Sequence, residues 1–335
     1  MQNPATIRLE VSPGVVCEQI YRPIEAVGLY VPAGTAPLPS AAVMLAIPAR
    51  IAGCSQRILC SPPRKDGSVD PAVLVAAQRC GVSKVLKIGG AQAIAAMAYG
   101  TQSVPKTDKI FGPGNSWVTA AKILVGNDAR GAALDLPAGP SEVLVLADDS
   151  ARAEFVAADL LAQAEHSVDA QVVLVTTSRK LAEETLIELR SQTRNLSRRE
   201  LLIRALEHAR AILVPDVETA IEVANRYAPE HLILQTRDPR SLLTDVRNAG
   251  SIFVGPYTPE TMGDYCTGAN HVLPTYGFAR AFSGLSLVDF MKRMTVQELT
   301  ANGIKDLGPT AVTLANIEGL DAHANAVNVR LRALQ

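Results

Sequence analysis

Residues 84–92, Lys-Val-Leu-Lys-Ile-Gly-Gly-Ala-Gln, contain the pattern from which the fold can be inferred. The first five residues are typical of a short strand, and the glycine pair is typical of a tight turn into a helix. The same order recurs earlier, with strands expected at 27–31 and 57–60, a loop at 32–34, and helices at 40–50 and 71–79. Later, a strand at 109–111 leads into Gly112-Pro113-Gly114-Asn115 and a helix through Lys122. This alternation predicts an α/β unit with a parallel sheet.

A second unit of the same kind follows the first. Its expected strands are 141–146, 171–176, 211–214, 231–235 and 251–254. Its expected helices are 153–164, 179–190, 198–210 and 218–228, with one more between the last two strands. Beyond residue 286 we expect helices without further strands. The predicted fold is therefore α/β, with two Rossmann-like parallel-sheet units in tandem and a helical C-terminal tail. The expected domains are an N-terminal segment that is a remnant of the first domain (1–29), a first α/β domain (30–140), a second α/β domain (141–285) and the tail (286–335).

The composition is that of an ordinary globular protein and excludes several classes of function. Hydrophobic residues make up 48% and charged residues 19% of the 335 residues, and the net charge is -1, so neither a nucleic acid nor an acidic lipid surface is expected as a partner. The five cysteines show no paired spacing, which argues against a structural zinc cluster or a disulfide framework and fits a cytoplasmic protein. No leader or membrane-spanning stretch is expected.

The helix expected at 153–164 ends in a pair of polar residues that could bind a metal ion. Its apolar residues recur at helical spacing, and Asp149 or Ser150 is the expected cap. Gln163 and His166 lie three residues apart on one face, so an amide oxygen and an imidazole nitrogen could reach one divalent ion. A histidine at the end of an apolar helix is more often a cap or a satisfied core group. The pair alone therefore does not identify a metal site.

Two glycine turns and one proline-rich hinge offer ligand contacts. Neither glycine turn matches a dinucleotide or phosphate-loop pattern, yet each presents backbone amides at a helix start, which suits a phosphate or a ribose. Glycine that merely permits a tight turn is an equally good explanation. Gln92 and Asn115 are the polar side chains placed to select a ligand there. Ser141, in the hinge between the units, fits ligand contact better than a nucleophile, because its turn is not Gly-x-Ser-x-Gly.

Acidic residues and histidines are paired at three further places. Glu230 and His231 are adjacent between a helix and a strand, Asp264 and His271 lie in one glycine-bounded loop, and Glu318 and His323 bracket a turn in the tail. An adjacent acid and imidazole suit proton transfer, although a solvated acid and a strand-capping histidine are the more frequent case. A set with mixed nitrogen and oxygen ligands, suited to zinc and less well to manganese, would be Gln163, His166, Asp264 and His323. Spacing does not establish that they converge.

Several of these stretches, in this order, resemble the histidinol dehydrogenase family. They are Pro-Ala-Gly-Pro-Ser-Glu-Val (137–143), Gln-Ala-Glu-His (163–166), Tyr-Ala-Pro-Glu-His-Leu (227–232), Gly-Asp-Tyr (263–265), Asn-His-Val-Leu-Pro (270–274) and Ala-His (322–323). Residues 112–115 and 292–299 match as well. The resemblance extends from Pro13 to Leu334, and so many separate motifs make it highly specific.

The resemblance implies zinc-dependent oxidation of L-histidinol to L-histidine through L-histidinaldehyde, with two NAD, as the last step of histidine biosynthesis. It assigns the zinc, one per subunit, to Gln163, His166, Asp264 and His323, and it assigns acid–base catalysis to Glu230 and His231. It places Tyr30, Gln92 and Asn115 at the NAD site. The implied substrate contacts are Ser141, Gln163, His166, His231, Asp264, His271, Glu318 and His323.

The resemblance also implies a homodimer in which the tail of one subunit completes the site of the other. Relative to the family, the chain is expected to be shortened at its N-terminus by a largely helical portion that completes one sheet domain. Three hypotheses follow: an active dehydrogenase, a truncated homologue that binds a metal or an imidazole ligand without catalysis, and a zinc hydrolase in which Glu230 activates water. Retention of every matched residue favours the first over the second, and the paired glycine turns favour a nucleotide enzyme over a hydrolase.

Overall fold

The structure, a computed structural model, describes residues 2–33 and 36–335, so Gly34 of the expected loop 32–34 lies outside the described residues. Contacts divide the chain into two compact units. One unit is Ile24–Phe290, and the other combines the residues up to Pro23 with Met291–Gln335. The domain limits expected from the sequence (1–29, 30–140, 141–285 and 286–335) are not tested by this division and stay predictions.

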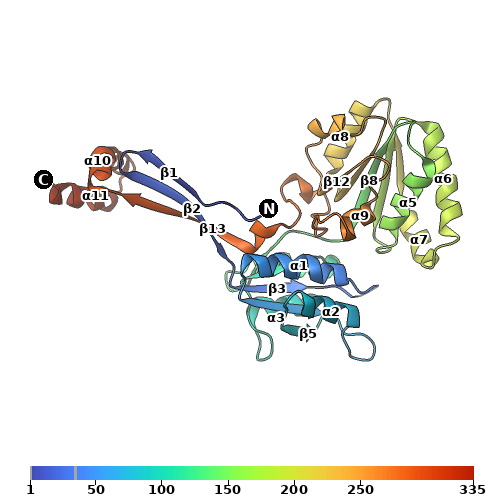
Figure 1. The fold of residues 1–335 in the computed structure, drawn as a ribbon, viewed down its shortest axis with the longest axis horizontal. Helices are drawn as coiled ribbons and strands as arrows, with labels where there is room; N and C mark the ends of the chain where they lie inside the picture. The colour runs from blue at the N-terminus through green and yellow to red at the C-terminus, as the bar shows by residue number, and fades with distance from the viewer. Residues whose placement is uncertain (1, 34–35) are drawn as a thin grey trace. The chain divides into compact units, whose positions relative to one another are not determined.

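The first sheet of the larger unit is parallel and has the strand order β5-β4-β3-β6-β7. Its strands are β3 (Ala26–Tyr30), β4 (Gln56–Ser61), β5 (Lys84–Lys87), β6 (Lys109–Phe111) and β7 (Ala133–Leu134). The helices between them are α1 (Pro39–Ala52), α2 (Pro71–Arg79), α3 (Ala91–Tyr99) and α4 (Ser116–Gly126). Helix α1 packs beside α2 and α3 beside α4, and α1 and α3 lie on opposite sides of β3 (Figure 1). The predicted alternation of strand and helix is confirmed here.

A buried ion pair supports the glycine turn that follows β6. The Lys122 ammonium group pairs with Asp135 and donates to the carbonyl oxygen of Gly112 at 2.8 Å, and Asp135 accepts from the Gly112 amide at 2.8 Å. Gly112 has φ +121°, and a Cβ there would lie 2.1 Å from the Tyr30 carbonyl oxygen. Only glycine therefore fits at this position, and β3 and the turn can approach closely.

The second sheet is also parallel, with the order β10-β9-β8-β11-β12. Its strands are β8 (Glu142–Ala147), β9 (Gln171–Thr176), β10 (Arg210–Leu213), β11 (His231–Gln235) and β12 (Ser251–Val254). Helices α5 (Ala153–Ala164), α6 (Arg179–Thr193) and α7 (Arg199–Leu206) contribute to one buried cluster, and α8 (Val217–Tyr227) contributes to another. The strands β8, β9 and β11 are largely buried, because helices cover both faces.

Two local predictions in this unit are wrong. Helix α5 begins after Arg152, which makes no side-chain capping bond. The expected cap Ser150 instead donates to Asp148, in a turn that precedes the helix. Between β11 and β12 the expected helix is only a 3₁₀ turn, Ser241–Thr244.

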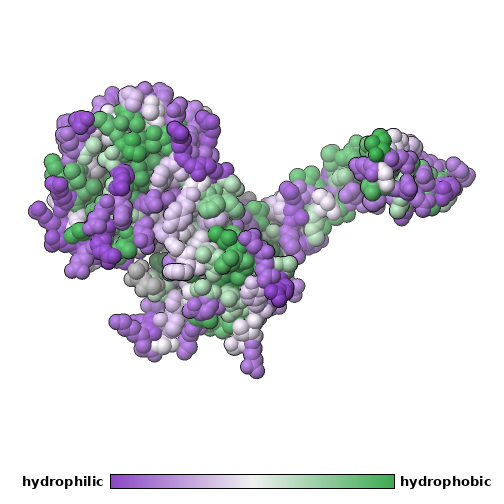
Figure 2. Space-filling view, turned by 180° about the vertical axis from the view of Figure 1, so that it is seen from behind, coloured by the Kyte–Doolittle hydropathy of each residue, from purple (hydrophilic) through white to green (hydrophobic). Residues whose placement is uncertain are grey.

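Edge strand β10 and helix α6 leave large apolar side chains exposed. These side chains are Leu186, Ile187, Ile212 and Leu213. Figure 2 shows hydrophobic side chains gathered on the surface of the part of the larger unit that contains the second sheet. An exposed apolar edge of this kind is typical of a contact surface.

The smaller unit is an antiparallel sheet followed by two helices. Strands β1 (Ile7–Ser12), β2 (Val15–Pro23) and β13 (Met291–Leu299) pair in the order β1-β2-β13. Helices α10 (Ala301–Ile317) and α11 (Asp321–Ala333) pack against each other (Figure 1). The C-terminal helices are confirmed, but the expectation of no strand after residue 286 is wrong. Strand β13 is almost fully exposed and therefore lacks the apolar pattern that marks a buried strand.

Candidate active site

A cavity of about 380 Å³ in the larger unit collects eight of the predicted site residues. They are Tyr30, Asn115, Ser141, His166, Glu230, His231, Asp264 and His271. The first sheet contributes the segments after β3, β5 and β6, which are its carboxyl ends, as expected for α/β sheets. The second sheet contributes Ser141, just before β8, and His231, at the start of β11. These positions are at the amino ends of its strands, opposite to that expectation.

One ring nitrogen of His231 contacts other groups of the protein, and the other ring nitrogen has no partner among the described residues. Its Nδ1 lies 3.2 Å from the carbonyl oxygen of Glu142 and 3.0 Å from the Gln163 amide. A carbonyl oxygen only accepts, so the proton belongs on Nδ1 and the lone pair on Nε2. Within the described chain, the buried Nε2 has no hydrogen-bond partner. Burial lowers the pKa of His231 to about 3, so the ring is neutral and ready to accept a proton.

Glu230 lies beside this histidine and is also buried. Its Oε2 accepts from the Glu142 backbone amide at 2.9 Å and lies 3.7 Å from His231 Nδ1. Burial raises the pKa of Glu230 well above its usual range. A carboxyl group with a raised pKa binds a proton more readily than an ordinary carboxylate, which suits it to proton transfer.

Metal-ligating side chains gather next to the acid and base. His166, Glu260 and Asp264 each offer a ligand atom, and these atoms lie within 4.8 Å of one another. Gln163 is fully buried beside Glu260 and His231. Burial raises the pKa of Asp264 to about 6 and lowers that of His166, so in both groups it favours the uncharged form. An imidazole and two carboxyl groups are donors that zinc accepts.

The remaining predicted residues lie in different surroundings. The His271 Nε2 is buried and has no hydrogen-bond partner in the described chain. The Asn115 side chain caps α4 by accepting from the Val118 amide at 3.1 Å. Asn115 therefore has a structural role at the start of this helix in addition to lining the cavity. Gln92 is exposed at the start of α3, beside Gly90, and does not line the cavity as the described residues define it.

Two predicted residues belong to the smaller unit. Glu318 ends α10 and His323 lies in the first turn of α11, and both are exposed. Neither is therefore part of the cavity formed within Ile24–Phe290. Their assignment to a metal ion and a substrate stays a prediction.

Glu260 is the site residue that sequence reasoning missed. It opens α9 (Glu260–Tyr265) and is 2% exposed. In the sequence, a glutamate at the start of a short helix looks the same as the many such glutamates that are exposed to solvent. Its immediate sequence therefore does not mark Glu260 as a site residue. The available signal was its spacing, because Glu260 and Asp264 are four residues apart and share a helix face.

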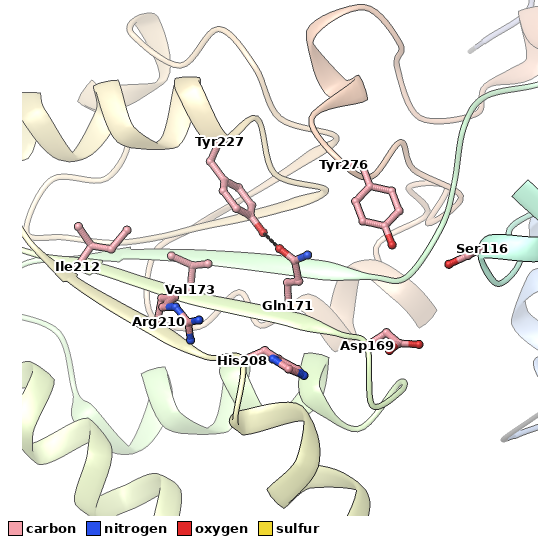
Figure 3. A pocket seen from close by; sticks show the side chains of 9 residues that line it. All are labelled: Ser116, Asp169, Gln171, Val173, His208, Arg210, Ile212, Tyr227 and Tyr276. Carbon is pink, nitrogen blue, oxygen red and sulfur yellow. Dashed lines mark hydrogen bonds between the residues drawn. The ribbon is translucent and has the colours of Figure 1, made fainter. Parts of the chain in front are cut away.

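A larger cavity of about 610 Å³ lies elsewhere in the same unit (Figure 3). It is lined by Ser116, Asp169, Gln171, Val173, His208, Arg210, Ile212, Tyr227 and Tyr276. The Tyr227 hydroxyl and the Gln171 amide oxygen there are 2.9 Å apart and hydrogen-bonded. It contains none of the predicted site residues. The smaller cavity is the candidate active site, because it brings an acid, a base and metal-ligating groups together.

Comparisons with known proteins identify the family. The sequence profile of histidinol dehydrogenase matches residues 1–331. The chain belongs to the histidinol dehydrogenase family. The histidinol dehydrogenase of Vibrio vulnificus is 55% identical over 333 residues, which cover 99% of this chain and 76% of the relative. That of Xanthomonas euvesicatoria is 59% identical over 323 residues, which cover 96% and 75%.

Solved structures agree with the sequence comparison. The histidinol dehydrogenase of Elizabethkingia anophelis matches with a TM-score of 0.95 and 46% identity, over 99% of this chain and 76% of that one. A propionaldehyde dehydrogenase from Clostridium phytofermentans matches with a TM-score of 0.56 at 14% identity, which shows a shared fold alone. The predicted family and fold class are confirmed. The chain is an oxidoreductase of histidine biosynthesis.

Proposed function

We propose that the chain oxidises L-histidinol to L-histidine through L-histidinaldehyde, with zinc and two NAD. The observation that carries this proposal is the arrangement around His231, whose Nε2 has no protein partner in the described chain and belongs to a residue that lines the cavity. Beside it lie the carboxyl group of Glu230 and the cluster His166, Glu260 and Asp264. A base, an acid and a metal-ligating cluster are the groups that a two-step alcohol oxidation requires.

His231 serves the first step as the general base. Oxidation of the alcohol removes a hydride from carbon and a proton from the hydroxyl group, and Nε2 is placed to accept that proton. The resulting positive charge lies close to the carboxyl oxygens of Glu230 and Glu260, which are 3.7 and 3.8 Å from Nδ1. Burial raises the pKa of both carboxyl groups, and a positive charge on the ring favours their ionised form, which in turn stabilises that charge. Because Nδ1 is held by the Glu142 carbonyl, the ring needs no reorientation.

Glu230 serves the second step. The aldehyde must add water before it can lose a second hydride, and a carboxylate takes the proton of the attacking water. Glu230 is fixed by the Glu142 amide and lies beside the first base. This geometry supports separate roles for the two adjacent residues.

The donor set fits a zinc ion. Gln163, His166 and Asp264 would hold it, together with His323, and Ser141, His271 and Glu318 would contact the substrate. When bound, zinc supplies a fixed attachment for the imidazole and amino nitrogens of the substrate, which orients the reacting carbon. The protein's contribution is to position these ligands, among which the Gln163 side chain is fully buried.

The first sheet supplies the surface for NAD, which accepts the two hydrides. Tyr30 lines the cavity, and its hydroxyl oxygen accepts from the Gly90 amide at 3.0 Å. Asn115 lies at the start of α4, where backbone amides suit a phosphate group. Gln92 would contact NAD from the start of α3.

The proposed protein is a cytoplasmic homodimer in which Glu318 and His323 act in the partner's site. Support comes from the smaller unit, where large apolar side chains are exposed on both the sheet and the helices: Ile7, Leu9, Leu314 and Ile317. Exposed apolar surface of this extent is typical of a subunit interface. No helix in the described chain is long and apolar enough to cross a membrane.

The proposal is tested by measuring NADH formation from L-histidinol by the purified chain. We expect turnover that is lost after treatment with a chelator and restored by added Zn²⁺. A folded protein that binds zinc yet forms no NADH would instead support the non-catalytic homologue. Turnover unaffected by metal removal would contradict the zinc assignment.

A further inference from the structure

Glu260 is a buried carboxyl group surrounded by residues of the proposed site. It is 2% exposed, and its Oε1 and Oε2 lie 3.8 Å from His166 Nε2 and His231 Nδ1, respectively. Within the described chain no lysine or arginine forms an ion pair with it. Burying a carboxyl group without such a partner costs stability that an apolar side chain would not. A role in packing alone therefore does not explain a glutamate here.

The closest contact of Glu260 is with the amide of Gln163. This amide can be placed in two ways, which differ by exchange of its oxygen and nitrogen. With the oxygen toward Glu260, an acceptor faces the two carboxyl oxygens, which are also acceptors when Glu260 is ionised. With the nitrogen toward Glu260, it lies 3.1 and 3.0 Å from the two carboxyl oxygens and donates to them. The carboxylate thereby selects the second orientation.

The selected orientation determines which atom of Gln163 is available as a ligand. The amide nitrogen is also 3.3 Å from the Glu142 carbonyl oxygen and 3.0 Å from His231 Nδ1. Three of these four neighbours are acceptors, whereas the protonated Nδ1 favours the amide oxygen, so the acceptors outnumber the one donor. The amide oxygen then takes the other position of the amide and no longer faces these acceptors. An amide binds a metal ion through its oxygen and not through its nitrogen.

We propose that Glu260 is a positioning residue that orients the Gln163 amide so that its oxygen binds the metal ion. This inference rests on the proposed function, in which Gln163 is a zinc ligand. It differs from direct ligation by Glu260, which the proximity of Glu260 to His166 and Asp264 also suggests. Partners of metal ligands that fix ligand orientation typically contribute about 10- to 100-fold to metal affinity.

The test measures zinc affinity of the metal-free full chain by competition with a chelator. Glu260→Met, which has no acceptor of this kind, should weaken zinc binding about 10- to 100-fold. Glu260→Gln keeps one oxygen acceptor for the Gln163 amide and should weaken zinc binding less than about tenfold. In a Gln163→Ala background, Glu260→Met should cause no further loss, because the group that it orients is gone.

Several outcomes would overturn the inference. Additive losses in the double variant, or equal losses for Glu260→Gln and Glu260→Met, would show that Glu260 binds the metal ion directly. Unchanged zinc affinity in Glu260→Met would show that Glu260 neither binds the metal ion nor orients the Gln163 amide. A fall in the Tm of metal-free Glu260→Met with unchanged zinc affinity would indicate a structural role. Failure of the proposed function is distinct, because the wild-type chain would then fail to bind zinc or to form NADH from L-histidinol, whereas this inference is tested by the zinc affinity of the variants.

Discussion

Among single residues, the neighbours Glu230 and His231 carry the proposed proton transfers. Both are buried, and both contact Glu142, one through its amide and the other through its carbonyl oxygen. The different hydrogen-bonding roles of the two side chains follow from these contacts. The backbone donor leaves Glu230 as an acceptor, and the backbone acceptor leaves the His231 lone pair on Nε2.

Separate roles for the two residues predict separable defects. His231→Asn should slow oxidation of L-histidinol about 10²- to 10⁴-fold, because the alcohol proton then lacks its acceptor. Glu230→Gln should slow oxidation of L-histidinaldehyde by a similar factor and affect the alcohol step less. NADH formation from each compound measures the two steps. The matched control is Glu222→Gln on the exposed face of α8, which should leave both rates unchanged. Equal slowing of both steps by Glu230→Gln would contradict this division.

At the scale of elements, α5 and β11 are joined by a buried polar pair. The Gln235 amide donates to Asp159 Oδ2 at 2.7 Å. Burial raises the pKa of Asp159 from 3.8 to about 7. Between these values the folded chain keeps a proton that the unfolded chain has released, so this group's contribution to stability falls as the pH rises from about 4 to about 7.

Removing this carboxyl group should therefore stabilise the fold in a pH-dependent way. The free energy of unfolding of Asp159→Asn should exceed that of the wild type by an amount that grows from pH 4 to pH 7 and reaches about 2 to 4 kcal/mol. Denaturant unfolding of the metal-free protein at several pH values measures this difference. Asp306→Asn, on the exposed face of α10, is the matched control. A difference that stays constant or shrinks as the pH rises would contradict the assignment.

Most of the parallel strands could be predicted from sequence, whereas the two-residue parallel strand β7 and the antiparallel strands could not. Strands β9, β11 and β12 lie within the predicted limits, because short apolar runs bounded by turns mark buried strands. Strand β13 was missed because its side chains are exposed, and only pairing with β2 reveals it. Glu260 was missed for a related reason, since its role comes from contacts with Gln163 that lie nearly a hundred residues away in the sequence.

At the scale of the molecule, the candidate site is built within Ile24–Phe290, and two predicted site residues lie outside it. Glu318 and His323 belong to the smaller unit. The resemblance named these residues, but no property of a single chain indicates which subunit's site they would complete. The homodimer proposed above requires the tail of a second copy of the chain to complete each site.

The most direct test combines two inactive chains in one dimer. His231→Asn and His323→Asn chains carrying different tags are co-expressed, and the heterodimer is isolated by sequential purification on both tags. If His323 acts in the partner's site, one of the two sites is intact, and about half of the wild-type activity should be recovered. Each variant homodimer should stay inactive. A heterodimer as inactive as the homodimers would contradict the claim, because both defects would then lie in separate, self-contained sites.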